Sequence, residues 1–405
     1  MTDVVIPLRR NLRFQTFWTG SVSATLGQAV GDVAYPLAIV TMTGSPGKAA
    51  LFSAIQIAGT LVAGLPVGSL ADRHDSQRLA LAAHAIRTAV ACVVAIALAG
   101  GWLTLPLLVA AAVLLGAGQA LGGATNILLL RSIVPGEQLT LALTQDEVRI
   151  NGASLAAPAL AGALYSLHHV APFTFTAAAF FLALTATALL PAGLARPTPS
   201  EEPAEGGMLA GLRELWGQPV LRAAVMLIMG VNTVGAGLEL VVIVILRHQA
   251  VPAYAIGLAL GIGAAGGLAG APLVKFLHRL PPGVLLLAVC GMEVPLLLLL
   301  AVPFGPWWAA GVLFAGLLGV PALRVLADIL VIRRAPPERR GRVVAAFMTL
   351  IALGMPAGLA GCGLLLQYLP AQTAMLTLAA AMAAVTAYGL SRPELRHARW
   401  PETNH

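Results

Sequence analysis

Residues 68–79 read GSLADRHDSQRL and form a short charged gap between two long apolar stretches, roughly 49–71 and 79–100. The hydrocarbon core of a bilayer is about 30 Å thick, so a helix needs about 20 mostly apolar residues to span it. Similar stretches fill nearly all of the chain on both sides of this gap. The full set is roughly 14–42, 49–71, 79–100, 104–131, 139–167, 170–191, 219–246, 252–277, 283–303, 306–332, 343–369 and 371–390. The sequence therefore predicts an all-α membrane protein with twelve transmembrane helices.

The composition of the chain also indicates a membrane protein. Of its 405 residues, 58% are hydrophobic and only 10% are charged. A soluble domain carries about a quarter charged residues. The formal net charge is +7, which on its own would suggest a partner of negative charge such as a nucleic acid.

The distribution of the basic residues gives another explanation. Of the 24 Lys and Arg residues, all but four are assigned to the termini, every second gap, a central linker or the adjoining helix ends. Arg87 is one of the residues assigned to a helix end. The exceptions are Lys48 and Arg247, in the alternate gaps, and Arg149 and Arg324, within apolar stretches. Because positive residues stay on the cytoplasmic side of a membrane, we expect both termini in the cytoplasm. The basic charge is then a signal of topology and not of nucleic-acid binding.

One polar segment divides the apolar stretches into two groups of six. Residues 193–218 are rich in Pro and Gly and contain an acidic cluster, which argues for a loose linker. We predict an N-terminal six-helix bundle over 1–192, a cytoplasmic linker over 193–218, and a C-terminal six-helix bundle with a short cytoplasmic tail over 219–405. Residues 209–216 could form a short amphipathic helix on the membrane surface. Two groups of six spans are typical of transporters with a site at the bilayer midplane.

The gap at 68–79 resembles the signature loop of the major facilitator superfamily, G-x-L-A-D-R-x-G-R-K. The matching residues are Gly68, Leu70, Ala71, Asp72 and Arg73, whereas Asp75, Ser76 and Gln77 depart from the pattern and Arg78 is the nearest substitute for its last basic residue. Residues 11–14 (NLRF), 34–37 (AYPL), 133–139 (IVPGEQL) and 337–343 (PERRGRV) are similar to the enterobactin-exporter and macrolide-efflux-like branch. The resemblance covers the whole chain and implies the major facilitator fold.

The resemblance also implies a cytoplasmic latch formed by Gly68, Asp72, Arg73 and Arg78. Gly68 allows two helix backbones to approach closely. Asp72 can accept hydrogen bonds from a neighbouring helix N-terminus and pair with an arginine. By this analogy the latch holds the two bundles closed on the cytoplasmic side. In the alternative interpretation, Arg73 and Arg78 only fix the topology.

Asp32, within the first span, is the leading candidate for function, because a charge in a span usually lines a cavity or pairs internally. Gln28 and Tyr35 share its helix face. A carboxyl group in a low-dielectric medium takes up a proton easily. Asp32 is therefore a candidate carrier of the coupling proton or a counter-charge for a cationic substrate. Alternatively, it is a neutral packing residue that is hydrogen-bonded to a neighbouring span.

Glu239, in the seventh span, is the nearest counterpart of Asp32. Aligning Gly20 with Gly230, which mark a faint internal repeat, places Glu239 one helical turn from Asp32. Asn232 and Glu239 are seven residues apart and share a helix face. We expect the two acids to face one central cavity. In the alternative, Glu239 is a gate or packing residue nearer the outer leaflet.

Two charge pairs lie within further spans. Asp146 and Arg149 are three residues apart and can pair on one helix, either as part of the cytoplasmic gate or as an interfacial pair. Arg324 and Asp328 are four residues apart. Arg324 could neutralise Asp328 and hold an anionic group of a substrate, or the two form a purely structural pair.

The sequence gives no support for several other chemistries. Cys92, Cys290 and Cys362 lie in apolar stretches without the spacing of a disulfide framework or metal site. There is no Walker A loop, so ATP is not the direct energy source. We expect no cofactor and no enzymatic activity, with the proton gradient as the energy source.

These features favour a monomeric, proton-coupled exporter in the cell membrane, acting on a small amphipathic molecule such as a drug, siderophore or metabolite. Protonation of Asp32, either alone or together with Glu239, would accompany release of the substrate outside. An importer or a lipid-like substrate flippase of the same fold is the alternative within transport. A non-transporting membrane scaffold or sensor is the alternative of another class, and it would need an interaction domain outside the membrane.

Overall fold

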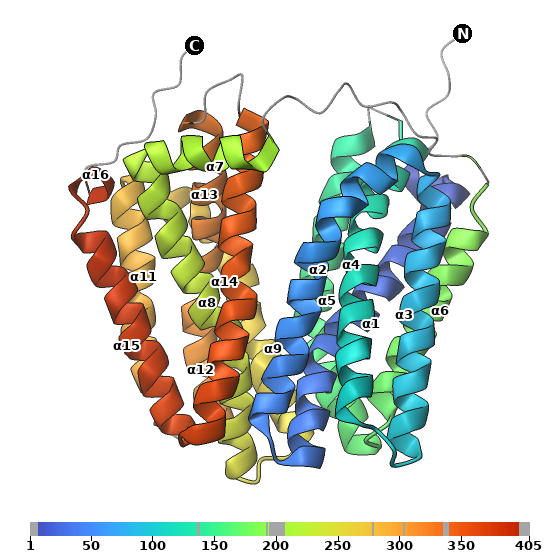
Figure 1. The fold of residues 1–405 in the computed structure, drawn as a ribbon, viewed down its shortest axis with the longest axis horizontal. Coiled ribbons are helices and arrows are strands. Elements are labelled where there is room, and N and C mark those ends of the chain that lie inside the picture. Colours follow the sequence, from blue (N-terminus) through green and yellow to red (C-terminus); the bar gives the residue numbers. More distant parts are fainter. Residues whose placement is uncertain are drawn as a thin grey trace. The chain divides into compact units, whose positions relative to one another are not determined.

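The computed structural model describes residues 7–135, 138–191, 193, 207–277, 279–302, 304–334 and 340–396, and these are almost entirely helical. The first half contains α1 (Leu12–Thr43), α2 (Pro46–Arg73), α3 (Ser76–Ala99), α4 (Leu105–Ile133), α5 (Leu139–Leu167) and α6 (Ala171–Ala188). The second half contains α7 (Gly207–Gly217), α8 (Pro219–His248), α9 (Ala253–Gly270), α10 (Val274–Leu277), α11 (Pro282–Leu300), α12 (Pro306–Leu317), α13 (Val320–Arg334), α14 (Arg340–Tyr368), α15 (Ala371–Leu390) and α16 (Pro393–Arg396). Figure 1 shows the long helices running up and down within each half.

The predicted apolar stretches are confirmed as helices, with ends that differ by about three residues at most. In the described part of the chain, 11 helices are long and apolar enough to cross a membrane. The remaining predicted span is α1, which is 32 residues long but carries several Ser, Thr and Gln residues and one Asp. Two spans are interrupted: a 3-10 turn at Ala271–Leu273 joins α9 to α10, and α12 is followed by the separate helix α13.

By their contacts, the residues separate into two compact units. Unit 1 comprises Met1–Ala38 and Ile55–Glu201, and unit 2 comprises Ile39–Ala54 and Glu202–His405. The hairpin Ile39–Ala54, where α1 ends and α2 begins, therefore groups with the helices of the second half. The division otherwise follows the polar linker.

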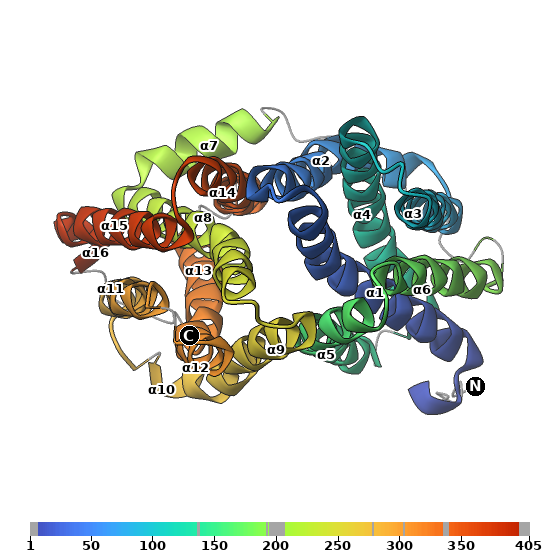
Figure 2. The same ribbon diagram turned by 90° about the horizontal axis from the view of Figure 1, so that it is seen from below.

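Small residues bring the helices of unit 1 into close contact. A Cβ on Gly20 of α1 would lie 2.8 Å from the Cβ of Ala186 in α6. A Cβ on Gly116 of α4 would lie 2.2 Å from the carbonyl oxygen of Gln56 in α2. α3 packs on both α4 and α6, and the end-on view in Figure 2 shows α3 beside α4. These close approaches are typical of helix packing in membranes, and they fix the turn of α2 that carries Gln56.

Glycines also allow close contact in two helix pairs of unit 2. α14 contacts α8 so closely that a Cβ on Gly358 would lie 1.9 Å from the carbonyl oxygen of Thr233. α9 contacts α12, where Cβ atoms on Gly266 and Gly270 would lie 2.1 and 2.2 Å from backbone carbonyl oxygens. The glycines of α9 superficially resemble a dinucleotide-binding pattern, and the structure shows these two at helix-packing positions.

The hairpin Ile39–Ala54 is held against α8 and α14. Arg247 donates a hydrogen bond to the Thr41 hydroxyl, and a Cβ on Gly363 would lie 2.2 Å from the Cβ of Ala50. A cavity of about 380 Å³ lies between the hairpin and the ends of these helices. The hairpin is thus packed backbone to backbone on α14.

The short amphipathic helix expected within the linker is confirmed as α7. α7 packs on α14, and Leu215 is fully buried while Trp216 is exposed. This arrangement gives α7 one face toward α14 and one exposed face, as an amphipathic pattern predicts.

Candidate functional site

Asp32 lies in the second half of α1, and its side chain is exposed although the helix around it is largely buried. Gln28 donates from Nε2 to Asp32 Oδ1 at 2.6 Å, and the buried Gln56 of α2 donates to the same oxygen at 3.0 Å. Among the described residues, no hydrogen bond reaches Oδ2. One carboxylate oxygen is therefore held by two amides, and the other is available to a proton or a ligand.

The backbone around Asp32 is locally weakened. Pro36 lies inside α1 and has no amide proton. The carbonyl group of Asp32, four residues earlier, therefore cannot receive its usual helical hydrogen bond. The free carbonyl oxygen of Asp32 therefore lies beside the carboxylate. Such an unpaired backbone group is disfavoured in hydrocarbon, so this face of α1 should not face lipid.

Arg87 is the residue that the sequence interpretation misplaced. The sequence pattern predicts a helix end on the cytoplasmic side for Arg87, whereas the structure places it in the interior of α3, where it is 5% exposed. Its guanidinium donates to Gln28 Oε1 and lies 3.9 Å from the ring centroid of Phe180 in α6. The aliphatic part of its side chain lies at Gly118 of α4, where a Cβ would be 2.7 Å from Arg87 Cγ.

Gln28 therefore connects an arginine to an aspartate. Its amide oxygen accepts from Arg87 and its amide nitrogen donates to Asp32. A buried cation therefore lies one side chain away from Asp32.

A second polar cluster lies further toward the start of α1. Arg149 pairs with Asp146 at 2.7 Å, which confirms that these two residues interact within α5. Arg149 also donates to the carbonyl oxygen of Ser21 at 2.8 Å and to the Thr25 hydroxyl. Ser21 in turn donates to Asn126 of α4 at 2.9 Å. The arginine thus fastens α5 to α1, and whether it takes part in a gate remains a prediction.

The two clusters occupy one stripe of α1. Ser21, Thr25, Gln28 and Asp32 are separated by four, three and four residues, the spacing of a single helix face. Their partners come from α2, α3, α4 and α5. α1 is therefore the element that collects the polar groups of unit 1.

Tyr35 has a different environment from its expected neighbours Gln28 and Asp32. It is buried, and its ring packs edge-on against Phe173 of α6 with centroids 5.0 Å apart. Tyr35 therefore contributes to the α1–α6 packing.

The candidates in the second half belong to unit 2. Glu239 of α8 is exposed. Asn232 is half-buried and donates to the carbonyl oxygen of Ile351 in α14 at 2.9 Å, which is a packing role. Arg324 is exposed on α13, and the side chain of Asp328 lies outside the described residues. Gly230 lies against Val385 of α15, and Gly20 lies against α6. Both glycines of the faint internal repeat therefore lie where the first and last spans of their own half meet.

The latch candidates are only partly described. Gly68, Asp72 and Arg73 belong to the last turns of α2, but the surroundings of Gly68 and the side chains of Asp72 and Arg73 lie outside the described part of the chain. Arg78 is exposed at the start of α3.

Asp75 and Gln77, which depart from the signature pattern, have structural roles. Asp75 caps α3 by accepting hydrogen bonds from the backbone amides of Gln77 at 2.8 Å and Arg78 at 3.2 Å. The Gln77 side chain donates to the carbonyl oxygens of Thr187 and Leu190, at the end of α6. Aspartate is a favoured N-cap residue, so the capping role of Asp75 was readable from the sequence.

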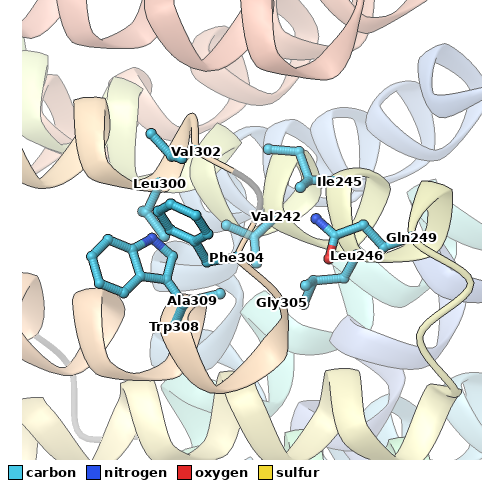
Figure 3. Close-up of a pocket in the computed structure, with 10 residues that line it drawn as sticks. All are labelled: Val242, Ile245, Leu246, Gln249, Leu300, Val302, Phe304, Gly305, Trp308 and Ala309. Atoms are coloured by element: carbon cyan, nitrogen blue, oxygen red, sulfur yellow. The ribbon is translucent and has the colours of Figure 1, made fainter.

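Figure 3 shows an apolar pocket at the end of α8, lined among others by Val242, Leu246 and Trp308. Its volume is about 10 Å³, which is room for about one water molecule. Trp308 is fixed by a hydrogen bond from its indole nitrogen to the carbonyl oxygen of Leu299 at 2.9 Å. The pocket is too small to be a substrate site. In the described part of the chain, no group of three or more His, Cys, Asp or Glu residues could hold a metal ion.

The sequence pattern of the Major Facilitator Superfamily matches residues 17–359. The chain is 26% identical to the multidrug efflux pump Tap of Mycobacterium tuberculosis, over 93% of this chain and 92% of that protein, and the same values hold for Tap of Mycobacterium bovis.

Solved transporter structures have the same fold. The nucleoside transporter NupG has a TM-score of 0.76 at 14% identity, covering 95% of this chain and all (100%) of its own. A bacterial homologue of the iron transporter ferroportin, in an inward-facing state, has a TM-score of 0.72 at 17% identity, covering 93% of this chain and 97% of its own.

Proposed function

Because the chain belongs to the major facilitator superfamily, and is therefore a multi-pass membrane transporter and not an enzyme, we propose that it exports a small amphipathic molecule in exchange for protons. The similarity to a multidrug efflux pump along nearly the whole chain supports export. The motifs of the N-terminal segment support a place in the enterobactin-exporter and macrolide-efflux-like branch.

The observation that carries the proposal is the asymmetric environment of Asp32. Oδ1 is saturated by the amides of Gln28 and Gln56, while the side chain as a whole is exposed. A carboxylate exposed to hydrocarbon would be strongly disfavoured, so this exposed face belongs to a water-filled space in the membrane. In such a place Oδ2 can bind either a proton or a hydrogen-bond donor of a substrate.

The cycle follows from this competition. In the inward-open state Asp32 is ionised and binds the substrate, and the loaded protein then opens outward. Protonation of Oδ2 from outside removes the acceptor and releases the substrate. Return of the protonated protein and loss of the proton to the cytoplasm complete one exchange. Glu239 is proposed as a second protonation site, and Asp72 with Arg73 and Arg78 as the inner latch.

Replacement of Asp32 tests the proposal. Asp32→Asn keeps the shape of the side chain and removes its titration, so pH-driven uptake of amphipathic compounds into inverted proteoliposomes should fall to the level of empty vesicles. Glu293→Gln is the matched control, because Glu293 is a half-buried acid in a span, on α11. We expect Glu293→Gln to transport like the parent.

Unchanged pH-driven transport by Asp32→Asn, at equal protein content, would exclude Asp32 as the essential proton site. If the same pH gradient instead drove the compound out of the inverted proteoliposomes, export would be excluded and the importer would be favoured.

A further inference from the structure

Arg87 has no carboxylate contact of its own in the described structure. Its guanidinium meets the amide oxygen of Gln28, the ring of Phe180 and the small residues Gly118 and Gly122 of α4. His84, one turn earlier on α3, is the titratable group nearest to it along its own helix. An arginine side chain stays protonated in proteins. The positive charge of Arg87 is therefore directed, through Gln28, at Asp32.

The two charges act as one unit because the polar group between them is a single amide. Gln28 cannot rotate its amide without losing both contacts, since its oxygen faces a donor and its nitrogen faces an acceptor. In a medium of low effective dielectric, unit charges still interact strongly at distances of several ångströms. When Asp32 is ionised, its negative charge balances Arg87 and the site has no net charge. When Asp32 is protonated, the site has a net charge of about +1.

We propose that Arg87 is the specificity-determining residue of this site, and that the Arg87–Gln28–Asp32 relay selects substrates without net charge that offer an N–H or O–H donor to Asp32 Oδ2. A cation attracted by Asp32 is repelled by Arg87, and an anion attracted by Arg87 is repelled by Asp32. A neutral or zwitterionic donor meets neither penalty. The counter-charge role for a cationic substrate, which the sequence left open, is thereby set aside. The inference rests on the proposed function only in taking Asp32 as the binding site.

Two hydrophobic ions of nearly equal size and opposite charge test this selectivity. Tetraphenylphosphonium and tetraphenylborate are equilibrated with purified protein in detergent, and their dissociation constants are compared between variants. The parent should discriminate little between the two ions. Arg87→Gln should bind the cation about tenfold more tightly than the parent does, a ratio that corresponds to about 1.4 kcal/mol.

The reverse change should favour the anion. Asp32→Asn leaves Arg87 uncompensated, so tetraphenylborate should bind about tenfold more tightly than to the parent. The double variant should return to the lack of preference of the parent. Arg87→Lys keeps the charge and loses the guanidinium geometry, and it should bind both ions as the parent does.

Some results would overturn the inference. A parent that already prefers the cation, with no gain in Arg87→Gln, would show that Arg87 does not balance Asp32. An equal gain in Arg87→Lys would assign the effect to packing and not to charge. If Arg87→Gln does not fold, as judged by its elution and melting, the anion binding of Asp32→Asn still decides. These binding measurements need no gradient, so unchanged proton-driven transport by Asp32→Asn in the preceding experiment would refute the proposed function separately.

Discussion

Gln28 accepts a hydrogen bond from a cation at one end of its amide and donates one to an anion at the other. Hydrogen bonds to charged groups contribute more than neutral ones, about 1.5–3 kcal/mol each. A residue of this kind is hard to replace, because no apolar side chain of its size satisfies either partner. Gln56, by contrast, contributes a single hydrogen bond to Asp32.

Gln28→Leu should therefore lower the stability of the protein by about 2–4 kcal/mol, since it leaves both charged partners without the amide. Thermal melting in detergent would measure the loss. Gln119→Leu is the control, because Gln119 is half-buried in α4 and makes no side-chain hydrogen bond within the described residues. Equal melting temperatures for the two variants would contradict the relay.

Arg87 and Arg149, the two arginines that contact the polar stripe of α1, differ in how replaceable their acidic partners are. Arg149 holds α1 through Ser21 and Thr25 as well as pairing with Asp146, and its side chain is 7% exposed. Asp146→Asn keeps an acceptor and leaves the contacts to α1 intact, so we expect a loss below about 1 kcal/mol. Arg149→Met removes all of these contacts and should cost about 1–3 kcal/mol. Thermal melting of both variants would test this order. A larger loss of stability for Asp146→Asn would mean that the ion pair, and not the contacts to α1, is the main role of Arg149.

At this scale, sequence reasoning finds a residue when its own helix shows the reason. Asp32 is a lone acid in an apolar stretch, with Gln28 one turn away, so both could be predicted. Asp146 and Arg149 are neighbours on one helix, and their pairing could also be predicted. Arg87 could not, because its partner Gln28 lies 59 residues away. Its only local signal was an arginine several turns into a span.

Among the elements, α14 shows how two kinds of glycine share one helix. Gly358 is buried against the backbone of Thr233 in α8, whereas Gly361 is exposed and a Cβ there would meet nothing within 4 Å. The apolar pattern predicted the helix and its ends, but it could not separate these two glycines. That distinction depends on the distance to another helix, which the pattern of a single helix does not contain.

Alanine substitutions on α14 would separate the two roles. Gly358→Ala should destabilise the protein by about 1–3 kcal/mol, because the added methyl group meets backbone that cannot move aside cheaply. Gly361→Ala should be neutral or stabilising by up to about 1 kcal/mol, since alanine has the higher helix propensity. Melting temperatures in one detergent would compare them, and equal effects would mean that the α8–α14 contact is looser than described.

For the molecule as a whole, the distribution of basic residues predicts the sides on which the helices end. Ser391, after α15, should face the cytoplasm, and His168, after α5, should face outside. Cysteines placed at either position can be labelled selectively in a Cys92→Ala background, because Cys92 is exposed whereas Cys290 and Cys362 are buried. A membrane-impermeant maleimide should label His168→Cys in intact cells and Ser391→Cys only in inverted vesicles. Labelling of both from one side would contradict the predicted topology.

The hairpin Ile39–Ala54 has a consequence for how such genes can recombine. It is encoded in the first half of the chain but belongs by its contacts to unit 2. A hybrid of two homologous proteins joined in the linker would combine the hairpin of one parent with the α14 of the other. At Gly363 a Cβ would lie 2.2 Å from the Cβ of Ala50, so a parent with a larger residue at either position would bring a collision into the hybrid. Working chimaeras should therefore carry codons 39–54 from the same parent as the second half, and the natural unit of exchange is discontinuous in the gene.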